Sequence, residues 1–417
     1  MTPSLHHWTA RFLCLAAVAA SLFGAQAALV SEPIRSPRSL PTTQWSIPWS
    51  GEVELPTTLA DDSGPTTQPG TFDSVPTSQP AQLDGPRITI DAAQPICGFA
   101  LCVHHISDLD LYLRSIDTVH AMGATSLEIV TPMFQYTKDA PSIRRLPDRC
   151  PTREQLIRLL THAKSKGMHT TLLPIVLLER RGKGDWRGVI SPRDWERWWD
   201  SYEEFLNYFI DIANVAHVDL LSVGSELNST QGQLERWREV IASVRQQFDG
   251  QLTYSANWDR YQDVGFWSDL DAISVSSYFT LTDTMEDPTL NELVAGWRPH
   301  RQELLAYAAS RERPLILSEL GYPSLDWAGN QPWNYVARGG ARADHDVQAR
   351  CFDAFFRSWS SALMSGRSGA AGFYIYHWDP YHRGGRHDVR YGVDGKPARG
   401  VIEQHFRILR GTTGFEE

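Results

Sequence analysis

The run Val218-Asp219-Leu220-Leu221-Ser222-Val223-Gly224-Ser225-Glu226 contains the pattern that decides the fold of this chain. A mostly apolar, β-prone stretch stops at a glycine, and a glutamate follows among small hydroxyl residues. A second stretch, PLILSELGY at residues 314–322, has the same shape and carries Glu319 at its end. A charged side chain at the end of a buried strand costs free energy unless it is paired or used. The two glutamates are therefore the first candidates for a function.

Short apolar runs alternate with longer amphipathic stretches from residue 91 onward. The apolar runs are residues 98–103, 126–131, 169–177, 219–223, 251–256, 272–276, 314–318 and 371–376. The helical patterns span residues 108–122, 152–166, 192–213, 231–247, 291–311, 343–365 and 396–409, with a shorter one near 265–267. Apolar runs separated by amphipathic helices are typical of parallel strands, and eight such units predict a (β/α)8 TIM barrel, an α/β fold. A doubly wound open sheet also alternates, but residues 98–108 lack the G-x-G-x-x-G turn that such sheets usually carry.

The N-terminal part of the chain has a different character. Arg11, an apolar stretch at residues 12–23 and Ala25-Gln26-Ala27 together predict a signal peptide over residues 1–27, and hence an exported protein. Residues 28–90 are rich in Pro, Thr and Ser, and such a segment buries too little apolar surface to fold, so we expect a disordered linker. We expect residues 91–417 to form one catalytic domain. We expect no membrane-spanning segment once the signal is cleaved, although an uncleaved anchor stays open.

Composition narrows the class of partner. The formal net charge is −10, which argues against nucleic acid or an anionic membrane surface as a partner. The chain has 15 Trp and 14 Tyr, several of them in polar stretches, as expected of a site that stacks on flat ligands. The cysteines are not spaced like a metal cluster, so we expect no metal and no cofactor. Beyond the signal, Cys97, Cys102, Cys150 and Cys351 allow three pairings, and the sequence does not choose between disulfides and thiols.

The active site of such a barrel lies at the carboxyl ends of the strands. The predicted strand ends and the loops after them carry carboxylates, amides and aromatic rings with few cations, which suits a neutral, hydroxyl-rich ligand. These residues are His104, His105, Gln135, Tyr136, Glu179, Asp185, Trp186, Glu226, Asn228, Asn257, Trp258, Tyr278, Glu319, His377, Trp378 and Asp379. Trp186 follows a Gly-rich loop, where packing explains an aromatic residue poorly, so we interpret it as a sugar platform. His104 and His105 lack further spaced ligands and are interpreted as structural or substrate contacts.

Two glutamates after the fourth and seventh strands fit the chemistry of glycoside hydrolysis. That reaction needs a carboxylic acid to protonate the leaving oxygen and a carboxylate to meet the developing oxocarbenium ion. Burial and mutual repulsion keep one acid of a close pair protonated while the other is ionised. If both side chains face the barrel mouth, the separation of roughly 5–5.5 Å that a retaining mechanism needs is within reach.

The sequence resembles the clan A glycoside hydrolases and is most similar to glycoside hydrolase family 113, the β-1,4-mannanase family. The residues that carry the resemblance extend over about 98–405. They are Gly123-Ala124-Thr125-Ser126, Trp186-Arg187-Gly188-Val189-Ile190, Trp199-Asp200-Ser201-Tyr202, Val223-Gly224-Ser225-Glu226-Leu227, Ser318-Glu319-Leu320-Gly321-Tyr322 and Gly372-Phe373-Tyr374-Ile375-Tyr376-His377-Trp378. The Trp-Arg-Gly and Gly-Ser-Glu-Leu pieces are the most specific of these.

The resemblance implies Glu226 as the acid/base and Glu319 as the nucleophile. It implies Trp378 as the aromatic floor under the sugar and Tyr278 as a hydrogen-bond donor to the nucleophile. Asn257 and Trp258 would be substrate contacts.

The chain departs from the clan pattern at two positions. Most of the clan has asparagine directly before the acid/base, where this chain has Ser225, which leaves the sugar open. No arginine stands at the end of the second strand to hold the nucleophile, and Gln135 and Lys138 are the nearest polar residues.

The sequence thus predicts an exported retaining hydrolase of a β-linked poly- or oligosaccharide, most similar to the β-1,4-mannanases. A β-glucanase, an exo-β-glycosidase and a catalytically silent sugar-binding barrel are the alternatives. The sequence predicts neither the oligomeric state nor endo versus exo action.

Overall fold

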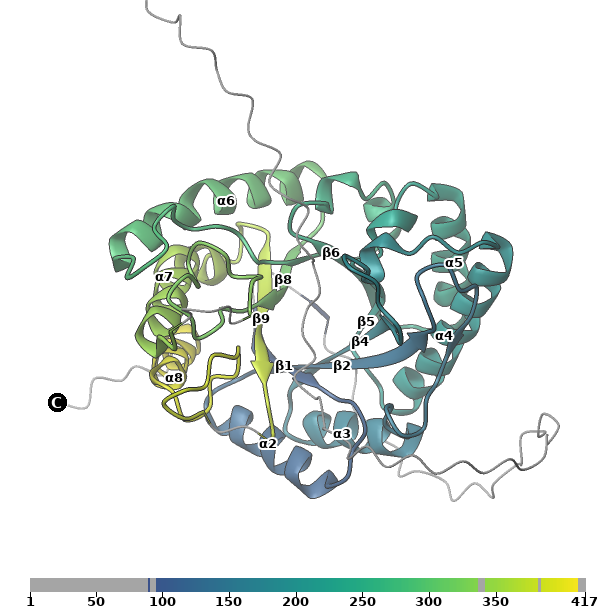
Figure 1. Cartoon of the computed structure of the whole chain (residues 1–417), viewed down its shortest axis with the longest axis horizontal. Helices are drawn as coiled ribbons and strands as arrows, with labels where there is room; N and C mark the ends of the chain where they lie inside the picture. Colours follow the sequence, from purple (N-terminus) through teal and green to yellow (C-terminus); the bar gives the residue numbers. More distant parts are fainter. Residues whose placement is uncertain (1–88, 91–94, 337–341, 382–383, 412–417) are drawn as a thin grey trace, which may run out of the picture. The chain divides into compact units, whose positions relative to one another are not determined.

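The computed structural model describes residues 89–90, 95–336, 342–381 and 384–411. Within these residues eight parallel strands form a closed barrel in the order β1, β2, β4, β5, β6, β7, β8, β9, and β1 closes it by pairing with both β2 and β9. The helices form an outer ring around the strands (Figure 1). The predicted (β/α)8 barrel is confirmed.

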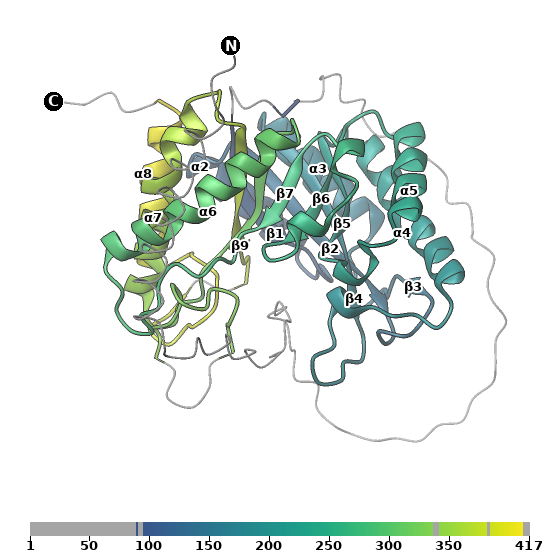
Figure 2. The same ribbon diagram turned by 90° about the horizontal axis from the view of Figure 1, so that it is seen from above.

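The observed elements follow the predicted runs closely. The barrel strands are β1 (Ile96–Cys102), β2 (Ser126–Gln135), β4 (His169–Leu178), β5 (Leu220–Ser225), β6 (Gln251–Asn257), β7 (Ile273–Ser276), β8 (Leu315–Leu320) and β9 (Ala370–Trp378). The helices are α2 (Leu109–Ala121), α3 (Arg153–Ser165), α4 (Trp195–Val215), α5 (Leu234–Gln247), α6 (Leu290–Ser310), α7 (His345–Met364) and α8 (Pro397–Leu409). Figure 2 shows α7 and α8 on the side of the barrel opposite α4 and α5.

Two details differ from the sequence prediction. The short helix expected near 265–267 is replaced by two 3-10 turns, Tyr261–Asp263 and Trp267–Asp269. A two-residue strand, β3 (Ile143–Arg144), pairs antiparallel with the end of β2. Neither element is long enough to give a periodic sequence signal.

Alternate strand residues divide the core into two layers. Phe99 and Leu101 belong to the apolar layer between the strands and the helices. Ile96 and Ala100, their neighbours on β1, belong to the layer inside the barrel. Because successive side chains of a strand point to opposite faces, layer membership shows which residues can reach the barrel interior and its mouth.

The predicted signal peptide and all but residues 89–90 of the predicted linker lie outside the described residues. Cys97, Cys102, Cys150 and Cys351 are free thiols. None of the described helices has the length and hydropathy needed to cross a membrane.

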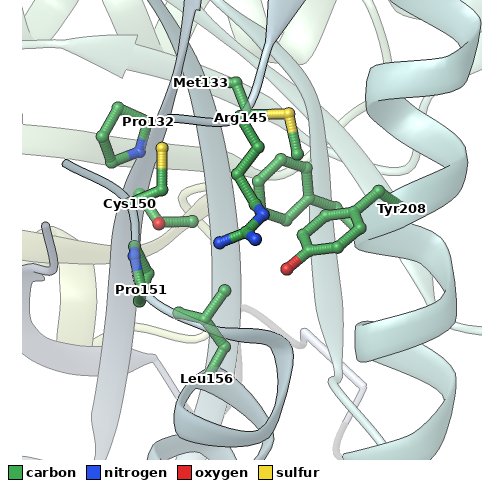
Figure 3. Close-up of a pocket in the computed structure, with 9 residues that line it drawn as sticks. Pro132, Met133, Arg145, Cys150, Pro151, Leu156 and Tyr208 are labelled. Atoms are coloured by element: carbon green, nitrogen blue, oxygen red, sulfur yellow. The ribbon is translucent and has the colours of Figure 1, made fainter. Parts of the chain in front are cut away.

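A shallow hollow lies on the outer side of β2, against α3 and α4. In Figure 3 the Arg145 guanidinium lies beside the Tyr208 ring, with Cys150, Pro151 and Leu156 on the other side. Neither Glu226 nor Glu319 lines this hollow, so it is separate from the candidate site described next.

Candidate active site

Glu226 lies directly after β5 in an unusual backbone conformation. Its φ is +51°, in the left-handed region that non-glycine residues seldom adopt. The side chain is 2% exposed. Such a conformation costs on the order of 1–3 kcal/mol and persists only where the surroundings enforce it.

An aromatic cluster on α4, α5 and β6 enforces this conformation. The Tyr202 hydroxyl donates to the Val223 carbonyl at 2.6 Å, and the Leu227 N–H donates to the Tyr254 hydroxyl at 2.8 Å. A Cβ at Gly224 would lie 2.8 Å from the Tyr202 hydroxyl and 3.0 Å from the Trp237 ring. The glycine therefore lets the rings approach the strand, and the two tyrosines hold the backbone on either side of Glu226.

The same cluster accounts for the tryptophans of α4. Trp198 stacks on Tyr202 with ring centroids 5.0 Å apart, and Trp199 packs edge-on against Trp237 at 5.3 Å. Trp195, Trp198 and Trp199 all pack in the apolar layer between the helices and the barrel.

Both oxygens of the Glu226 carboxylate accept hydrogen bonds. The Ser276 hydroxyl donates to Oε1 at 2.6 Å, and Nη2 of Arg187 donates to Oε2 at 2.7 Å. The Arg187 side chain is 4% exposed, so the ion pair is buried. Arg187 lies on a 3-10 turn, Arg187–Val189, in the loop after β4. The Ser229 hydroxyl fastens this loop by donating to the Ile190 carbonyl at 2.6 Å.

Glu319 lies within β8 and is 1% exposed. Its Oε2 accepts a hydrogen bond from the Tyr278 hydroxyl at 2.8 Å, so the predicted contact between these two residues is confirmed. Burial, followed by the charge of Glu226, raises the pKa of Glu319 to about 7, while Arg187 and Tyr278 act in the opposite direction.

Ser276 connects the two glutamates. It pairs with Glu319 across the β7–β8 ladder, and its hydroxyl binds Glu226. Because the two carboxylates share a buried site, the charge of Glu226 disfavours ionisation of Glu319. The arrangement suits a reaction that needs one acid and one carboxylate at the same centre.

Two further predicted contacts lie near this centre. Asn257 ends β6, is 5% exposed and pairs with Ser276 in the β6–β7 ladder. Its Oδ1 has no hydrogen-bond partner among the described residues. Ser225, whose Oγ is also buried without such a partner, precedes Glu226. Buried polar atoms without protein partners are expected where water or a ligand binds.

Trp258 forms half of an aromatic platform. It stacks on Trp333, from the loop after β8, with centroids 5.4 Å apart and an angle of 16° between the rings. Both rings are half-buried. Trp333 could not be predicted from the sequence, because only the fold brings the loop after β8 next to the end of β6.

The expectation that Trp378 forms the sugar floor is wrong. Trp378 packs edge-on against Phe99 at 5.6 Å, in the layer between strands and helices, and Arg399 of α8 lies over its ring at 5.8 Å. A register shift between β1 and β9 makes Tyr376 pair with Ala100 and Trp378 with Leu101, which adds His377 as an extra residue. This bulge turns Trp378 outward.

Tyr376 takes the inward position instead. Its ring lies 6.3 Å from that of Tyr278 and 5.6 Å from that of Tyr391. Burial first, and then the charges of Cys102 and Glu319, raise the pKa of Tyr376. Tyr376 and Tyr391 are therefore aromatic neighbours of Glu319 that the sequence analysis missed. A bulge in β9 would have been the only signal, and apolar periodicity does not reveal a single added residue.

Two other predicted contacts are structural. Nε2 of Gln135 donates to the carbonyls of Thr137 and Lys138 at 2.8 and 3.1 Å, and its Oε1 accepts from Nε1 of Trp198 at 2.8 Å. Its amide is thereby committed to the loop after β2. Trp186 is 8% exposed, and its ring lies so close to Gly188 that a Cβ there would be 2.3 Å away. Both side chains are thus used in packing, and a sugar contact by either one stays a prediction.

His104 is half-buried at the end of β1. Burial, and then the charges of Arg149 and His377, lower the pKa of His104 to about 3. A neutral imidazole at this position fits the predicted polar contact with substrate. No group of three His, Cys, Asp or Glu side chains within the described part of the chain is arranged to hold a metal ion.

Comparison with known proteins gives a consistent result. The model of Glycoside Hydrolase Family 113 matches residues 112–396. No curated protein matches the chain in sequence. A solved structure of a GH113 β-1,4-mannanase is 23% identical, with 75% of this chain and 99% of that chain covered and a TM-score of 0.67.

Two further solved structures resemble the chain. The GH113 β-mannanase of Alicyclobacillus acidocaldarius in complex with ManMIm is 24% identical, with 76% and 98% covered and a TM-score of 0.66. An endo-β-1,4-mannanase of Thermotoga petrophila is 12% identical, with 78% and 79% covered and a TM-score of 0.51. At these identities the structures show a shared fold.

Proposed function

The chain belongs to glycoside hydrolase family 113, and we propose that it hydrolyses β-1,4-mannan with retention of configuration, using Glu226 as acid/base and Glu319 as nucleophile. The observation that carries this proposal is the buried carboxylate pair joined through Ser276. The mannanase structures it resembles support the choice of sugar.

The proposed reaction has two steps. In the first, a Glu319 oxygen attacks the anomeric carbon, the glycosidic bond breaks, and the Glu226 carboxyl gives its proton to the leaving oxygen. In the second, Glu226 takes a proton from water as the water oxygen attacks the anomeric carbon and the ester bond to Glu319 breaks. The Tyr278 hydroxyl, 2.8 Å from Glu319 Oε2, orients the nucleophile. Asn257 and His104 face sugar hydroxyls, and the Trp258–Trp333 pair stacks on a neighbouring sugar.

The first experiment measures reducing-end release from mannan, glucomannan, cellulose, laminarin and xylan by the full chain and three variants. We expect Glu226→Gln and Glu319→Gln to lose at least roughly 10³-fold in turnover on mannan while retaining the circular-dichroism spectrum of the parent. Glu239→Gln is the matched control, because Glu239 is an exposed residue of α5 that pairs with Arg236. Full activity in both site variants would contradict the proposal. Activity on glucan alone would reassign the sugar, and binding without hydrolysis by the parent would favour a silent barrel.

A second experiment separates the two roles. Azide can replace the lost carboxylate in either variant, and the configuration of the glycosyl azide reports which step was rescued. We expect Glu226→Ala to give the β-azide, since azide attacks the intermediate on Glu319. We expect Glu319→Ala to give the α-azide by direct displacement. The reverse pattern would exchange the two roles.

We also propose that the protein is exported, on the basis of the signal pattern in residues 1–27. N-terminal sequencing of the mature protein tests this. A new N-terminus near Ala28 is expected, and recovery of the intact N-terminus from the cytosol would contradict it.

A further inference from the structure

The two glutamates have hydrogen-bond donors of different charge. Arg187 donates from Nη2 to Oε2 of Glu226 at 2.7 Å, with both side chains at most 4% exposed. Glu319 has an uncharged donor, the Tyr278 hydroxyl. A buried carboxylate is ionised most easily beside a cation. The proton that the pair shares in the free enzyme therefore lies on Glu319, and Glu226 is the carboxylate.

This proton distribution is opposite to the one that the first step needs. That step requires a protonated Glu226 and an ionised Glu319, whereas the second step requires an ionised Glu226 that acts as a base. The free enzyme is thus arranged for the second step. An ion pair with Arg187 must weaken before Glu226 can act as an acid.

We propose that Arg187 is a positioning residue that decides which glutamate carries the shared proton. Its guanidinium holds Glu226 as an oriented carboxylate in the free enzyme, and substrate binding loosens this pair so that the proton passes from Glu319 to Glu226. The guanidinium binds Glu226 again after the leaving group departs, when Glu226 must act as a base. This inference rests on the roles of the two glutamates proposed above.

The structure also offers a means for substrate to compete for Arg187. The Nε–H of Arg187 is buried and has no hydrogen-bond partner among the described residues. Two more buried polar atoms, Ser225 Oγ and Asn257 Oδ1, also lack such partners. Ser225 precedes Glu226 in the sequence, and Asn257 pairs in the β6–β7 ladder with Ser276, which binds Glu226. A sugar hydroxyl that accepts a bond from Nε would draw the guanidinium away from Glu226.

The kinetic test compares Arg187→Gln, which removes the charge, with Arg187→Lys, which keeps it. Loss of a cation near the pair favours protonation of both carboxyls. We expect both limbs of the pH profile of kcat/KM to move up by at least about one pH unit in Arg187→Gln, and to stay near the parent in Arg187→Lys. Arg238→Gln, an exposed arginine of α5, is the control. A uniform fall in kcat/KM with unmoved limbs would mean that Arg187 only supports the fold of its loop, and would overturn the proposal.

A leaving-group comparison separates the two steps. A dinitrophenyl β-mannoside needs no proton in the first step, so the second step limits its kcat. Without the guanidinium, Glu226 holds its proton more tightly and is a scarcer base. At pH 6 we expect Arg187→Gln to lower kcat for this substrate at least about tenfold, and more than kcat/KM for mannan. An equal loss on both substrates would count against the proposal.

A measurement of protonation without substrate tests this inference separately from the proposed function. In protein labelled with ¹³C at the glutamate Cδ, Glu226→Gln and Glu319→Gln assign the two carboxyl signals. At pH 6 we expect the parent to show Glu226 as a carboxylate and Glu319 as a carboxyl. Arg187→Gln should move the Glu226 signal toward the carboxyl position. A protonated Glu226 in the parent would overturn the inference even if Arg187→Gln does not fold. If the parent hydrolyses no glycan, the proposed function is refuted, and the two ¹³C carboxyl signals still test this inference.

Discussion

Glu319 combines full burial with a charge that its proposed role as nucleophile requires. Its folded pKa of about 7 lies above the ordinary 4.5, so between these values the folded protein binds a proton that the unfolded chain has released. The stabilisation this provides is complete below pH 4.5 and is lost as the pH rises through 7. Above pH 7 the protein therefore carries the cost of a buried carboxylate.

Glu319→Gln removes that titration and should change the pH dependence of stability. At pH 4.5 the variant and the parent should have similar free energies of unfolding. At pH 8 the variant should be the more stable, by up to about 3 kcal/mol from the shift of pKa. Urea unfolding at both pH values measures this, with Glu239→Gln as the control. A difference between variant and parent that is the same at both pH values would show that Glu319 ionises normally.

Tyr278→Phe tests the bond that the resemblance implied and the structure confirmed. Removing the hydroxyl takes away a hydrogen bond to the charged form of Glu319, worth about 1.5–3 kcal/mol, so we expect kcat to fall roughly 10- to 100-fold. Because Tyr278 lowers the pKa of Glu319, and Glu319 holds the shared proton in the free enzyme, the alkaline limb of the kcat/KM profile should also move up. Tyr307→Phe, on α6, is the control. A lower kcat with an unmoved alkaline limb would indicate that Tyr278 contacts the sugar only.

At the scale of single residues, the sequence predicted those that a strand end places and missed those that a loop or a bulge places. Glu226, Glu319, Asn257 and Tyr278 follow apolar runs, so counting along the strands was enough to place them at the barrel mouth. Arg187 was part of a quoted motif, but nothing in its sequence shows that a 3-10 turn directs it to Glu226.

At the scale of elements, helix and strand bounds were predictable because each carries its own signal. A capping box at Thr152 and Gln155 begins α3, and each of the eight predicted strand runs overlaps a barrel strand. The loops after β8 and β9 gave no such signal. Their conformation depends on contacts between residues far apart in the sequence.

Lys396 provides one of those contacts. Its buried Nζ donates to Ser324 Oγ at 2.8 Å and to the Arg390 carbonyl at 2.9 Å, and lies 3.5 Å from Asp388. It thereby joins the loop after β8 to the loop after β9. Tyr391, on the second loop, donates from its hydroxyl to the Pro332 carbonyl at 2.5 Å, next to Trp333 on the first. The aromatic platform therefore depends on both loops.

Lys396→Met should loosen this junction. It leaves buried acceptors without their donor, so we expect a loss of about 2–3 kcal/mol in the free energy of unfolding and a KM that rises several-fold while kcat changes less. Thermal unfolding and kinetics on the best glycan measure both quantities. Lys183→Met, at an exposed loop residue, is the control for loss of charge. A variant with unchanged stability and KM would mean that the other loop contacts suffice.

At the scale of the whole molecule, closure of the barrel requires β1 to pair with β2 and β9, and β1 begins at the bottom of the barrel. Ile90 is 6% exposed and belongs to the inner layer with Ile96, Leu220 and Ile316. Its N–H donates to Oε1 of Gln251 at 2.5 Å. The predicted boundary after residue 90 is therefore too late, because Ile90 belongs to the folded domain.

Two truncations differ in whether they keep Ile90. A chain that starts at Thr89 keeps Ile90, and since residues 28–88 are predicted to be a linker, we expect its Tm and kcat to match those of the full chain. A chain that starts at Pro95 loses Ile90 and exposes the apolar side chains beneath it, which should cost about 1.5–3 kcal/mol and lower Tm by several degrees. Ile90→Ala in the full chain should lower Tm in the same direction, because the defect lies in one side chain. If removing residues 1–88 alone lowered Tm as much, the segment before Thr89 would have to contribute to the fold, and its assignment as a linker would be wrong.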